Sequence, residues 1–214
     1  MKAVSSECLS REHHRAHAIR VGLAEDMLRH FTKSPENRAL KICVRTRLSA
    51  LLTPELMALA LYRVAHFLYV NGRWRIAFCI TWLNFLINKV NITPQSCIGP
   101  GCRLAHPAGV TFHGSAGRGL TLYSLAVCCP DSSLNGAMAS APKLGDNVAL
   151  GAHAVVIGSF CIGDGTRIAQ AVRLASDAPA GVLVVSSSVR PRIRARSELP
   201  GQPSRPSGLA MESR

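Results

Sequence analysis

An aliphatic residue returns at every sixth position in two long runs of this sequence. A period of six is typical of a parallel β-helix, in which each hexapeptide forms one short strand and a corner. Each unit buries its apolar residue only by stacking on its neighbours. An ordinary β domain would instead show a period of two. The eleven positions are Ile98, Leu104, Val110, Ala116, Leu122, Leu144, Leu150, Val156, Ile162, Ile168 and Leu174. Because three hexapeptides make one triangular coil, the pattern predicts a parallel β-helix of about four coils.

The six-residue pattern fails between the two runs. This interruption predicts a loop at 129–143. A loop of about fifteen residues in a regular solenoid is uncommon unless it has a task, which is usually to cover or complete a site.

The N-terminal part of the sequence is expected to contain two regions. Residues 1–35 are polar and rich in His and Arg, and His13 and His17 are expected on a solvated helix face rather than in a metal site. Residues 36–90 are expected to form an α-helical domain, because their apolar residues follow helical spacing. Its helices are expected at 39–52, at 54–70 with Thr53 as the N-cap, and from 74 to about 89.

The β-helix domain is expected to occupy residues 91–193. Pro94 disfavours helix in the residue before it, so the chain becomes extended shortly before the aliphatic period begins. The last residues are rich in Ser, Arg and Pro, which predicts a disordered basic tail at 194–214.

The charge balance of the chain is basic, with 25 Lys and Arg against 12 Asp and Glu. A basic surface implies anionic partners, but the sequence has no motif typical of nucleic-acid binding, so no nucleic acid is expected. The most apolar stretch runs from Ile76 to Ile87 and is too short to span a bilayer. It predicts a buried or oligomer-facing helix, while its flanks Arg73, Arg75 and Lys89 leave peripheral membrane contact open.

The eight cysteines show no CxxC pair and no regular framework. The first ten residues are polar and do not resemble a signal peptide. We therefore expect free thiols and a cytoplasmic protein.

One residue in the first coil has the chemistry of a catalyst. His106 follows Leu104 at a position that does not face the core, so its imidazole is expected to point outward, toward solvent or a neighbouring subunit. An imidazole in such a position can accept a proton from a hydroxyl at neutral pH. A surface histidine without a task is the alternative that spacing alone leaves open.

Several segments resemble the serine O-acetyltransferases, a family of hexapeptide-repeat acyltransferases. The resemblance covers about residues 55 to 193, and its strongest segments are Leu61-Tyr62-Arg63-Val64-Ala65-His66, Asn91-Ile92-Thr93-Pro94, Ala105-His106-Pro107-Ala108-Gly109, Leu150-Gly151-Ala152-His153-Ala154 and Val185-Ser186-Ser187-Ser188-Val189-Arg190. It is closest to the members associated with polysaccharide and specialised-metabolite pathways.

The resemblance implies a left-handed parallel β-helix with an N-terminal α-helical segment, assembled as a homotrimer or a dimer of trimers. It implies transfer of an acetyl group from acetyl-CoA to a hydroxyl of a small molecule, chemistry like that of cysteine biosynthesis, with no metal. His106 would be the general base and Asn91 would stand where the family orients that base. The residues implied in binding CoA are Gly151, Ala152, Ala169, Arg190 and Arg192.

The sequence departs from the family at the base. Asn91 replaces an Asp, and Asn can hold the imidazole tautomer but cannot stabilise the imidazolium; in a serine protease the corresponding change costs about 10⁴ in rate. No Asp or Glu occurs between Glu55 and Asp131. A carboxylate partner for His106 must therefore come from the loop, from Asp146 or from a neighbouring chain.

The sequence also departs from the family at the acceptor. Ala105, Ser140 and Ala141 replace residues that grip serine in the family. The acceptor is therefore left open between L-serine and a serine-like or sugar hydroxyl. A second hypothesis, of a different class, is a catalytically weakened trimer that acts as a binding or scaffold subunit.

Overall fold

The computed structural model describes residues 16–31, 53–131 and 141–186, with the side chains of 16–21 and 31 excepted. The predicted helix at 39–52, most of the predicted loop and the whole basic tail lie outside the described residues. His13, Arg190 and Arg192 lie there too.

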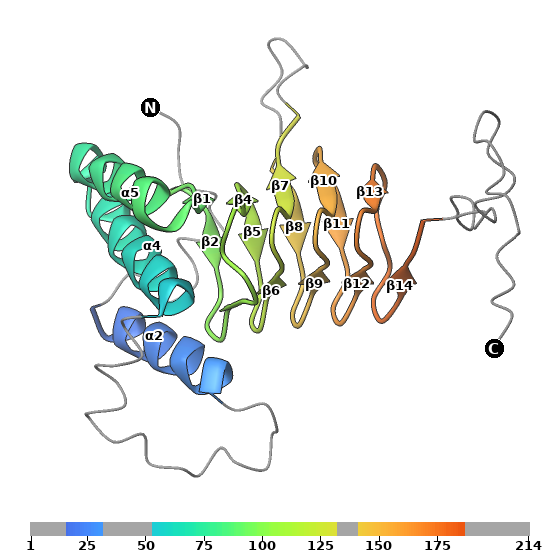
Figure 1. Ribbon diagram of the computed structural model, residues 1–214, viewed down its shortest axis with the longest axis horizontal. Coiled ribbons are helices and arrows are strands. Elements are labelled where there is room, and N and C mark those ends of the chain that lie inside the picture. The colour runs from blue at the N-terminus through green and yellow to red at the C-terminus, as the bar shows by residue number, and fades with distance from the viewer. Residues whose placement is uncertain (1–15, 32–52, 132–140, 187–214) are drawn as a thin grey trace, which may run out of the picture.

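The described helices lie together at one end of the molecule (Figure 1). They are α2 (Ala16–Phe31), α4 (Pro54–Val70) and α5 (Trp74–Asn88). Thr53 is the N-cap of α4 and Pro54 its first residue, as expected, because proline fits the first helical turn where its missing N–H is not needed. Gly72 follows α4 with a φ of +79°, a conformation that glycine adopts without strain.

Within residues 91–186, short strands form three parallel sheets. Sheet A contains β1 (Asn91–Ile92), β4 (Thr111–Phe112), β7 (Val127–Cys129), β10 (Val155–Ile157) and β13 (Arg173–Leu174). Sheet B contains β2 (Cys97–Ile98), β5 (Ser115–Ala116), β8 (Lys143–Leu144) and β11 (Cys161–Ile162). Sheet C contains β3 (Arg103–Leu104), β6 (Thr121–Leu122), β9 (Ala149–Leu150), β12 (Arg167–Ile168) and β14 (Leu183–Val184).

The chain visits sheets A, B and C in turn and then begins the next coil, so the three sheets are the faces of a prism (Figure 1). A bridge between Ile162 and Ala178 continues sheet B in the last coil. The described chain thus completes five coils rather than about four. All eleven aliphatic positions of the six-residue pattern are buried, in one hydrophobic core that runs through the prism.

The six-residue pattern selects the wrong residue at one position of sheet A. Val110 is buried, but the residue that aligns with the inward residues of sheet A is Phe112, which pairs with Ile92 on one side and Cys128 on the other. Phe112 follows Leu104 by eight positions, and Ala116 follows Phe112 by only four. The step of eight residues and the step of four together equal two hexapeptides, so the inward residues from Ala116 onward keep the six-residue period.

The polar segment 1–35 contains α2, and hydrogen bonds join this helix to the first coils of the prism. Asp26 is fully buried and accepts a hydrogen bond from the Cys102 amide at 2.7 Å. Arg29 donates to the Gly101 carbonyl at 2.6 Å and to the Thr121 hydroxyl at 3.1 Å. Helix α2 therefore contacts both α4 and the first coil of the prism. The solvated face expected for His13 and His17 concerns side chains outside the described residues.

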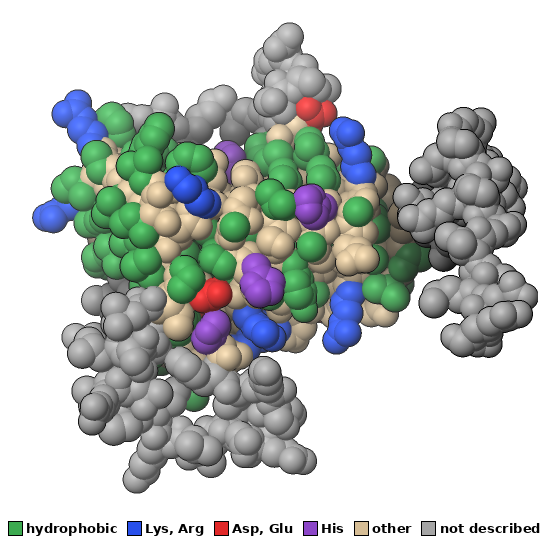
Figure 2. Space-filling view, viewed as in Figure 1, with side chains coloured by type: hydrophobic (Ala, Val, Ile, Leu, Met, Phe, Trp, Pro, Cys, Tyr) green, Lys and Arg blue, Asp and Glu red, His purple; other side chains and the backbone are tan. Residues whose placement is uncertain are grey.

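Helix α5 exposes most of its apolar side chains, so of the alternatives that the sequence left open, burial within this chain is ruled out. Figure 2 shows hydrophobic side chains gathered at the helical end of the molecule. Among the described residues no helix has the length and apolarity needed to cross a membrane.

Five of the cysteines are free thiols: Cys79, Cys102, Cys128, Cys129 and Cys161. Cys97 is disulfide-bonded, so the expectation of free thiols is wrong for that residue. Burial raises the pKa of Cys102 to about 12, and burial followed by the charge of Asp131 raises the pKa of Cys129. The thiols of Cys102 and Cys129 are therefore held protonated and are poor nucleophiles.

Candidate functional site

The predicted site residues that the structure describes lie along one edge of the prism. This edge, which we call the C-to-A edge, consists of the corners that leave sheet C and enter sheet A: 105–110, 123–126, 151–154 and 169–172. The residues concerned are His106, Gly151, Ala152 and Ala169, with Asn91 at the start of the first strand of sheet A. The fold therefore brings together residues that are separated by almost eighty positions.

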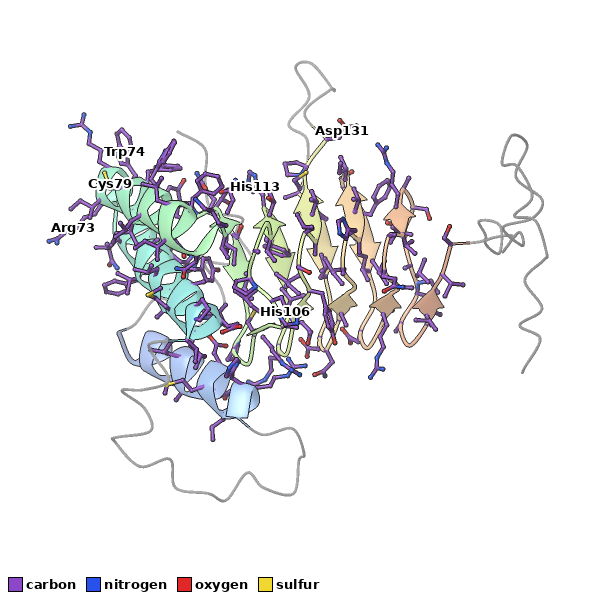
Figure 3. The ribbon with its side chains drawn as sticks, in the orientation of Figure 1. Arg73, Trp74, Cys79, His106, His113 and Asp131 are labelled. Carbon is purple, nitrogen blue, oxygen red and sulfur yellow. The ribbon has the colours of Figure 1, made fainter. Side chains whose placement is uncertain are left out.

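His106 is exposed and lies at the start of the longest described corner of this edge. The Ala105 amide before it donates to the Leu122 carbonyl at 2.8 Å, which holds the end of β3 on the next coil. The Val110 amide donates to the Pro107 carbonyl at 3.2 Å and closes the turn that follows. His106 is therefore held between a fixed strand end and a closed turn, with its side chain on the surface (Figure 3).

Backbone hydrogen bonds join the His106 corner to the segment that carries Asn91. The Asn91 amide donates to the Val110 carbonyl at 2.9 Å, and the Gly109 amide donates to the Lys89 carbonyl at 2.9 Å. Asn91 is exposed. The candidate base and the residue predicted to orient it thus occupy neighbouring segments at the same end of the C-to-A edge.

Two of the three amides predicted to bind CoA are used inside the prism. The Gly151 amide donates to the Ile168 carbonyl at 2.8 Å, and the Ala169 amide donates to the Val184 carbonyl at 2.9 Å. Among the hydrogen bonds of the described residues, the Ala152 amide donates to none. Of the three, Ala152 is therefore the amide best suited to meet a ligand on this edge.

Two exposed apolar residues of the C-to-A edge were not predicted. Tyr123 and Leu125 form the corner of the second coil, between His106 in the first coil and His153 in the third. The Leu125 amide donates to the Ala108 carbonyl at 3.1 Å, so this corner stacks on the corner that carries His106. The two side chains therefore offer a short apolar surface on the coil next to that of His106. No sequence signal identifies them, because corner residues that point outward do not follow the six-residue period.

His153 lies on the same edge in a left-handed conformation, with a φ of +58°. Its amide donates to the Ser124 carbonyl at 3.0 Å, which fixes the corner on the coil before it. Non-glycine residues rarely adopt this conformation. The His153 side chain is exposed, on the coil that follows the coil of Leu125.

The other candidates for a partner of His106 lie on different edges. His113 follows β4 on the edge between sheets A and B, and Figure 3 places it away from His106. Asp131 also lies on that edge, after β7. Asp146 lies on the edge between sheets B and C, where its Oδ1 atom accepts a hydrogen bond from the Arg118 amide at 2.7 Å. Asp131 is the only acidic residue of the loop at 129–143, so it and Asp146 of the same chain both lie away from His106. A carboxylate partner for His106 would therefore come from a neighbouring chain or from an acidic residue outside the described ranges.

Within the part of the chain that the structure describes, no group of three or more His, Cys, Asp or Glu residues is arranged to hold a metal ion. The side chains available on and next to the C-to-A edge are an exposed imidazole, an exposed amide on the neighbouring segment and a short apolar surface.

Comparison with known proteins identifies relatives over almost two thirds of this chain. The chain is 32% identical over 142 residues to the serine acetyltransferase of Helicobacter pylori (strain ATCC 700392 / 26695), which covers 65% of this chain and 82% of the relative. It is 31% identical over 134 residues to the serine acetyltransferase of Synechococcus elongatus, covering 62% of this chain and 54% of that protein.

Solved structures with the same fold include two serine acetyltransferases with bound ligands. The enzyme of Neisseria gonorrhoeae in complex with serine matches with a TM-score of 0.69 and 22% identity, covering 88% of this chain and 73% of that one. Isoform 3 of Entamoeba histolytica in complex with cysteine matches with a TM-score of 0.70 and 21% identity, covering 91% and 67%. No family model matches the sequence. The identity over four fifths of the Helicobacter pylori relative is decisive: this chain belongs to the serine acetyltransferase family.

Proposed function

We propose that this protein is an O-acetyltransferase that moves the acetyl group of acetyl-CoA to the hydroxyl of L-serine or of a serine-like acceptor. The observation that carries the proposal is the exposed His106 on the C-to-A edge, which also bears Asn91 and the residues predicted to contact CoA. The family membership supports the acyltransferase class. The prism is a left-handed parallel β-helix in this proposal, and the working assembly is a homotrimer with sites between subunits.

The reaction assigned to His106 is general-base catalysis. The imidazole takes the proton of the acceptor hydroxyl while the hydroxyl oxygen attacks the thioester carbonyl of acetyl-CoA. The tetrahedral intermediate then collapses, the carbon–sulfur bond breaks, and the imidazolium returns its proton to the departing thiolate. A positioned base of this kind contributes about 10²- to 10⁴-fold.

Asn91 is proposed to hold the imidazole of His106 in the orientation required of a base. Its side-chain carbonyl can accept a hydrogen bond from an imidazole N–H but brings no negative charge to the imidazolium. We therefore expect a slower enzyme than one with a carboxylate at this position.

The donor is proposed to lie along the C-to-A edge, with its thioester near His106. The Ala152 amide would donate to the pantetheine arm, while Tyr123 and Leu125 would cover its apolar part. Gly151 and Ala169 would contact the pantetheine arm through van der Waals contacts alone, since their amides already donate hydrogen bonds within the prism. Arg190 and Arg192 remain the proposed cations for the phosphates, because a guanidinium grips phosphate bidentately.

The acceptor is proposed to be recognised differently from serine in the rest of the family. Ala105 stands beside the base in place of a carboxylate and cannot pair with an ammonium group. A desolvated zwitterion needs charged partners, and residues 132–140 contain no charged side chain, so a neighbouring chain would have to supply them.

The alternative function is a catalytically weakened trimer that serves as a binding or scaffold subunit. The observation that favours it is Asn91, since His106 then has no carboxylate partner from Asp146 of its own chain.

One experiment separates the two functions. The full-length protein is incubated with acetyl-CoA and a panel of hydroxyl acceptors that includes L-serine, and free CoA is followed by chromatography, since the cysteines of the protein would react with a thiol reagent. The enzyme predicts acceptor-dependent release of CoA that falls at least 100-fold in His106→Ala. Absence of acceptor-dependent CoA release would favour the scaffold function. Release that is unchanged in His106→Ala would instead refute the assignment of His106 as the general base. A matched control is Thr111→Ser, a conservative change on the neighbouring strand β4.

A further inference from the structure

Helix α5 presents an apolar ridge on the outside of the molecule. Its buried residues, Ala77, Asn84 and Asn88, lie on one narrow line of the helix. The exposed large apolar side chains cover the opposite side and both flanks: Trp74, Ile76, Phe78, Trp82, Leu83, Phe85, Leu86 and Ile87. Trp82 is 64% exposed and Leu86 is 57% exposed, so the ridge stands clear of the rest of the chain.

The polarity of α5 is the reverse of that expected for a helix in water. Asn84 faces the protein and donates to the Ala58 carbonyl of α4 at 3.0 Å, and Asn88 donates to Asn84 at 2.9 Å. A surface helix of a water-exposed protein normally turns its apolar side to the core and its polar side outward. A continuous exposed apolar surface of this kind marks an interaction site.

Cations stand at both ends of the ridge. Arg73 and Arg75 are exposed at the N-terminal end, and Lys89 is exposed at the C-terminal end. The Arg75 guanidinium lies 5.1 Å from the Trp74 ring and the Lys89 ammonium 6.0 Å from the Phe85 ring, so both ends combine a cation with an aromatic ring. Figure 3 shows Arg73 and Trp74 at the outer end of the helical part.

The charges argue against α5 of a second copy of the chain as the occupant. If α5 packed on α5 of another copy, its end cations would meet either the same cations or those of the opposite end. The sequence contains no Asp or Glu between Glu55 and Asp131 that could compensate them. Like charges brought together at an interface are costly, whereas lipid phosphates would neutralise them.

We propose that α5 docks the protein on the surface of an anionic lipid bilayer. The ridge enters the boundary between headgroups and acyl chains, while Arg73, Arg75 and Lys89 lie at the level of the phosphates, the arrangement typical of an interfacial helix. The described helices are not suited to crossing a membrane, so α5 lies in the plane of the surface. Because the helices occupy one end of the prism, the later coils project away from the bilayer (Figure 1).

The chain carries its own reporter for this contact, because both of its tryptophans, Trp74 and Trp82, belong to α5. Full-length protein is mixed with vesicles of phosphatidylcholine alone or with phosphatidylglycerol added. We expect a blue shift of tryptophan emission and co-flotation with the anionic vesicles, and weak binding to the neutral ones. Each cation near the surface is worth about fivefold in partition, so Arg73→Glu with Arg75→Glu should reduce anionic binding at least 25-fold.

A variant of the ridge and a matched control complete the test. Leu86→Glu should abolish binding without removing a tryptophan, while Leu183→Glu, the same change at an exposed leucine of β14, should leave it intact. Thermal unfolding verifies that both variants are folded. Emission that is already blue without vesicles, equal binding to both kinds of vesicle, or a smaller assembly of Leu86→Glu in light scattering without lipid would each overturn the proposal. The last result would assign the ridge to contacts between copies.

Discussion

The Nε atom of Arg63 on α4 lies 3.1 Å from the Oδ2 atom of Asp26 on α2, in an ion pair that is almost completely buried. Arg63 also donates to the carbonyls of Ile98 and Gly99, and Asp26 accepts from the Cys102 amide. Two helices and the first coil of the prism therefore meet at a single pair of charges. Through this pair the helices hold the coil from which His106 projects.

Removal of one partner of this pair should destabilise the fold strongly. Asp26→Ala leaves the Arg63 guanidinium buried without a counter-charge, and we expect a loss of about 3–5 kcal/mol in the free energy of unfolding. Denaturant titration of the two proteins measures this loss. The exposed pair of Arg118 and Glu25, with an N–O distance of 2.9 Å, is the control, because Glu25→Ala should cost less than about 1 kcal/mol. Equal losses in the two variants would contradict the assigned role of the buried pair.

A carboxylate in place of Asn91 should accelerate the proposed reaction. Asn91→Asp would place a negative charge where it can stabilise the imidazolium of His106, and we expect acetyl transfer at least tenfold faster than in the unmodified protein. Initial rates at saturating acetyl-CoA measure the effect. The double variant with His106→Ala is the control and should show no gain. A rate that is unchanged in Asn91→Asp would mean that Asn91 does not act on the base.

Gly151 should prove to be a packing residue of the prism. A Cβ atom added there would lie 2.7 Å from the Gln170 amide nitrogen and 2.8 Å from the Ala169 carbonyl carbon, so the backbone of the next coil must shift. Gly151→Ala should therefore lower stability by about 1–3 kcal/mol. In Gly22→Ala on α2 the nearest atom is 3.5 Å away, in the Arg63 side chain, and this control should be neutral or slightly stabilising. A Gly151→Ala variant of normal melting temperature that binds acetyl-CoA weakly would assign the residue to the ligand instead.

The pH dependence of stability should contain a contribution from His113. Burial lowers the pKa of His113 in the folded state below its ordinary value of 6.5. The unfolded chain therefore takes up the proton first as pH falls, and stability is lost from about pH 6.5 down to the folded-state pKa. Denaturant midpoints measured between about pH 7.5 and 5 should fall less steeply in His113→Gln than in the unmodified protein. Thr111→Ser, a neutral change two residues away, should show the same fall of the denaturant midpoint with pH as the unmodified protein. An equally steep fall in His113→Gln would refute the contribution assigned to His113.

The prism could be predicted from the sequence because each short strand places one residue in the core. That residue must be apolar in every coil, so Ile98 and Leu174 belong to one visible pattern although several coils separate them. His106 was identified as a candidate base because it places a reactive side chain at an outward position of this pattern and because the surrounding segment resembles a known family. In both cases the information is local or repeated.

The remaining features depend on contacts that produce no repeated pattern in the sequence. Asp26 and Arg63 are far apart in the sequence, and each by itself suggests a residue in water rather than a buried pair. Tyr123 and Leu125 lie on an outward corner, where the core places no constraint on residue type. The sequence left α5 open between a buried helix, an oligomer-facing helix and peripheral membrane contact for a related reason, since an apolar helix looks the same in the sequence whether protein or another medium covers it.

The eight-residue and four-residue steps on either side of Phe112 have a consequence for every comparison of this chain with another solenoid. A correct alignment needs two gaps that cancel, one at the corner of His106 and one at the corner of His113. An alignment without them matches all later strands but misassigns β4 and the two corners beside it. One of these corners carries His106, the residue proposed as the base.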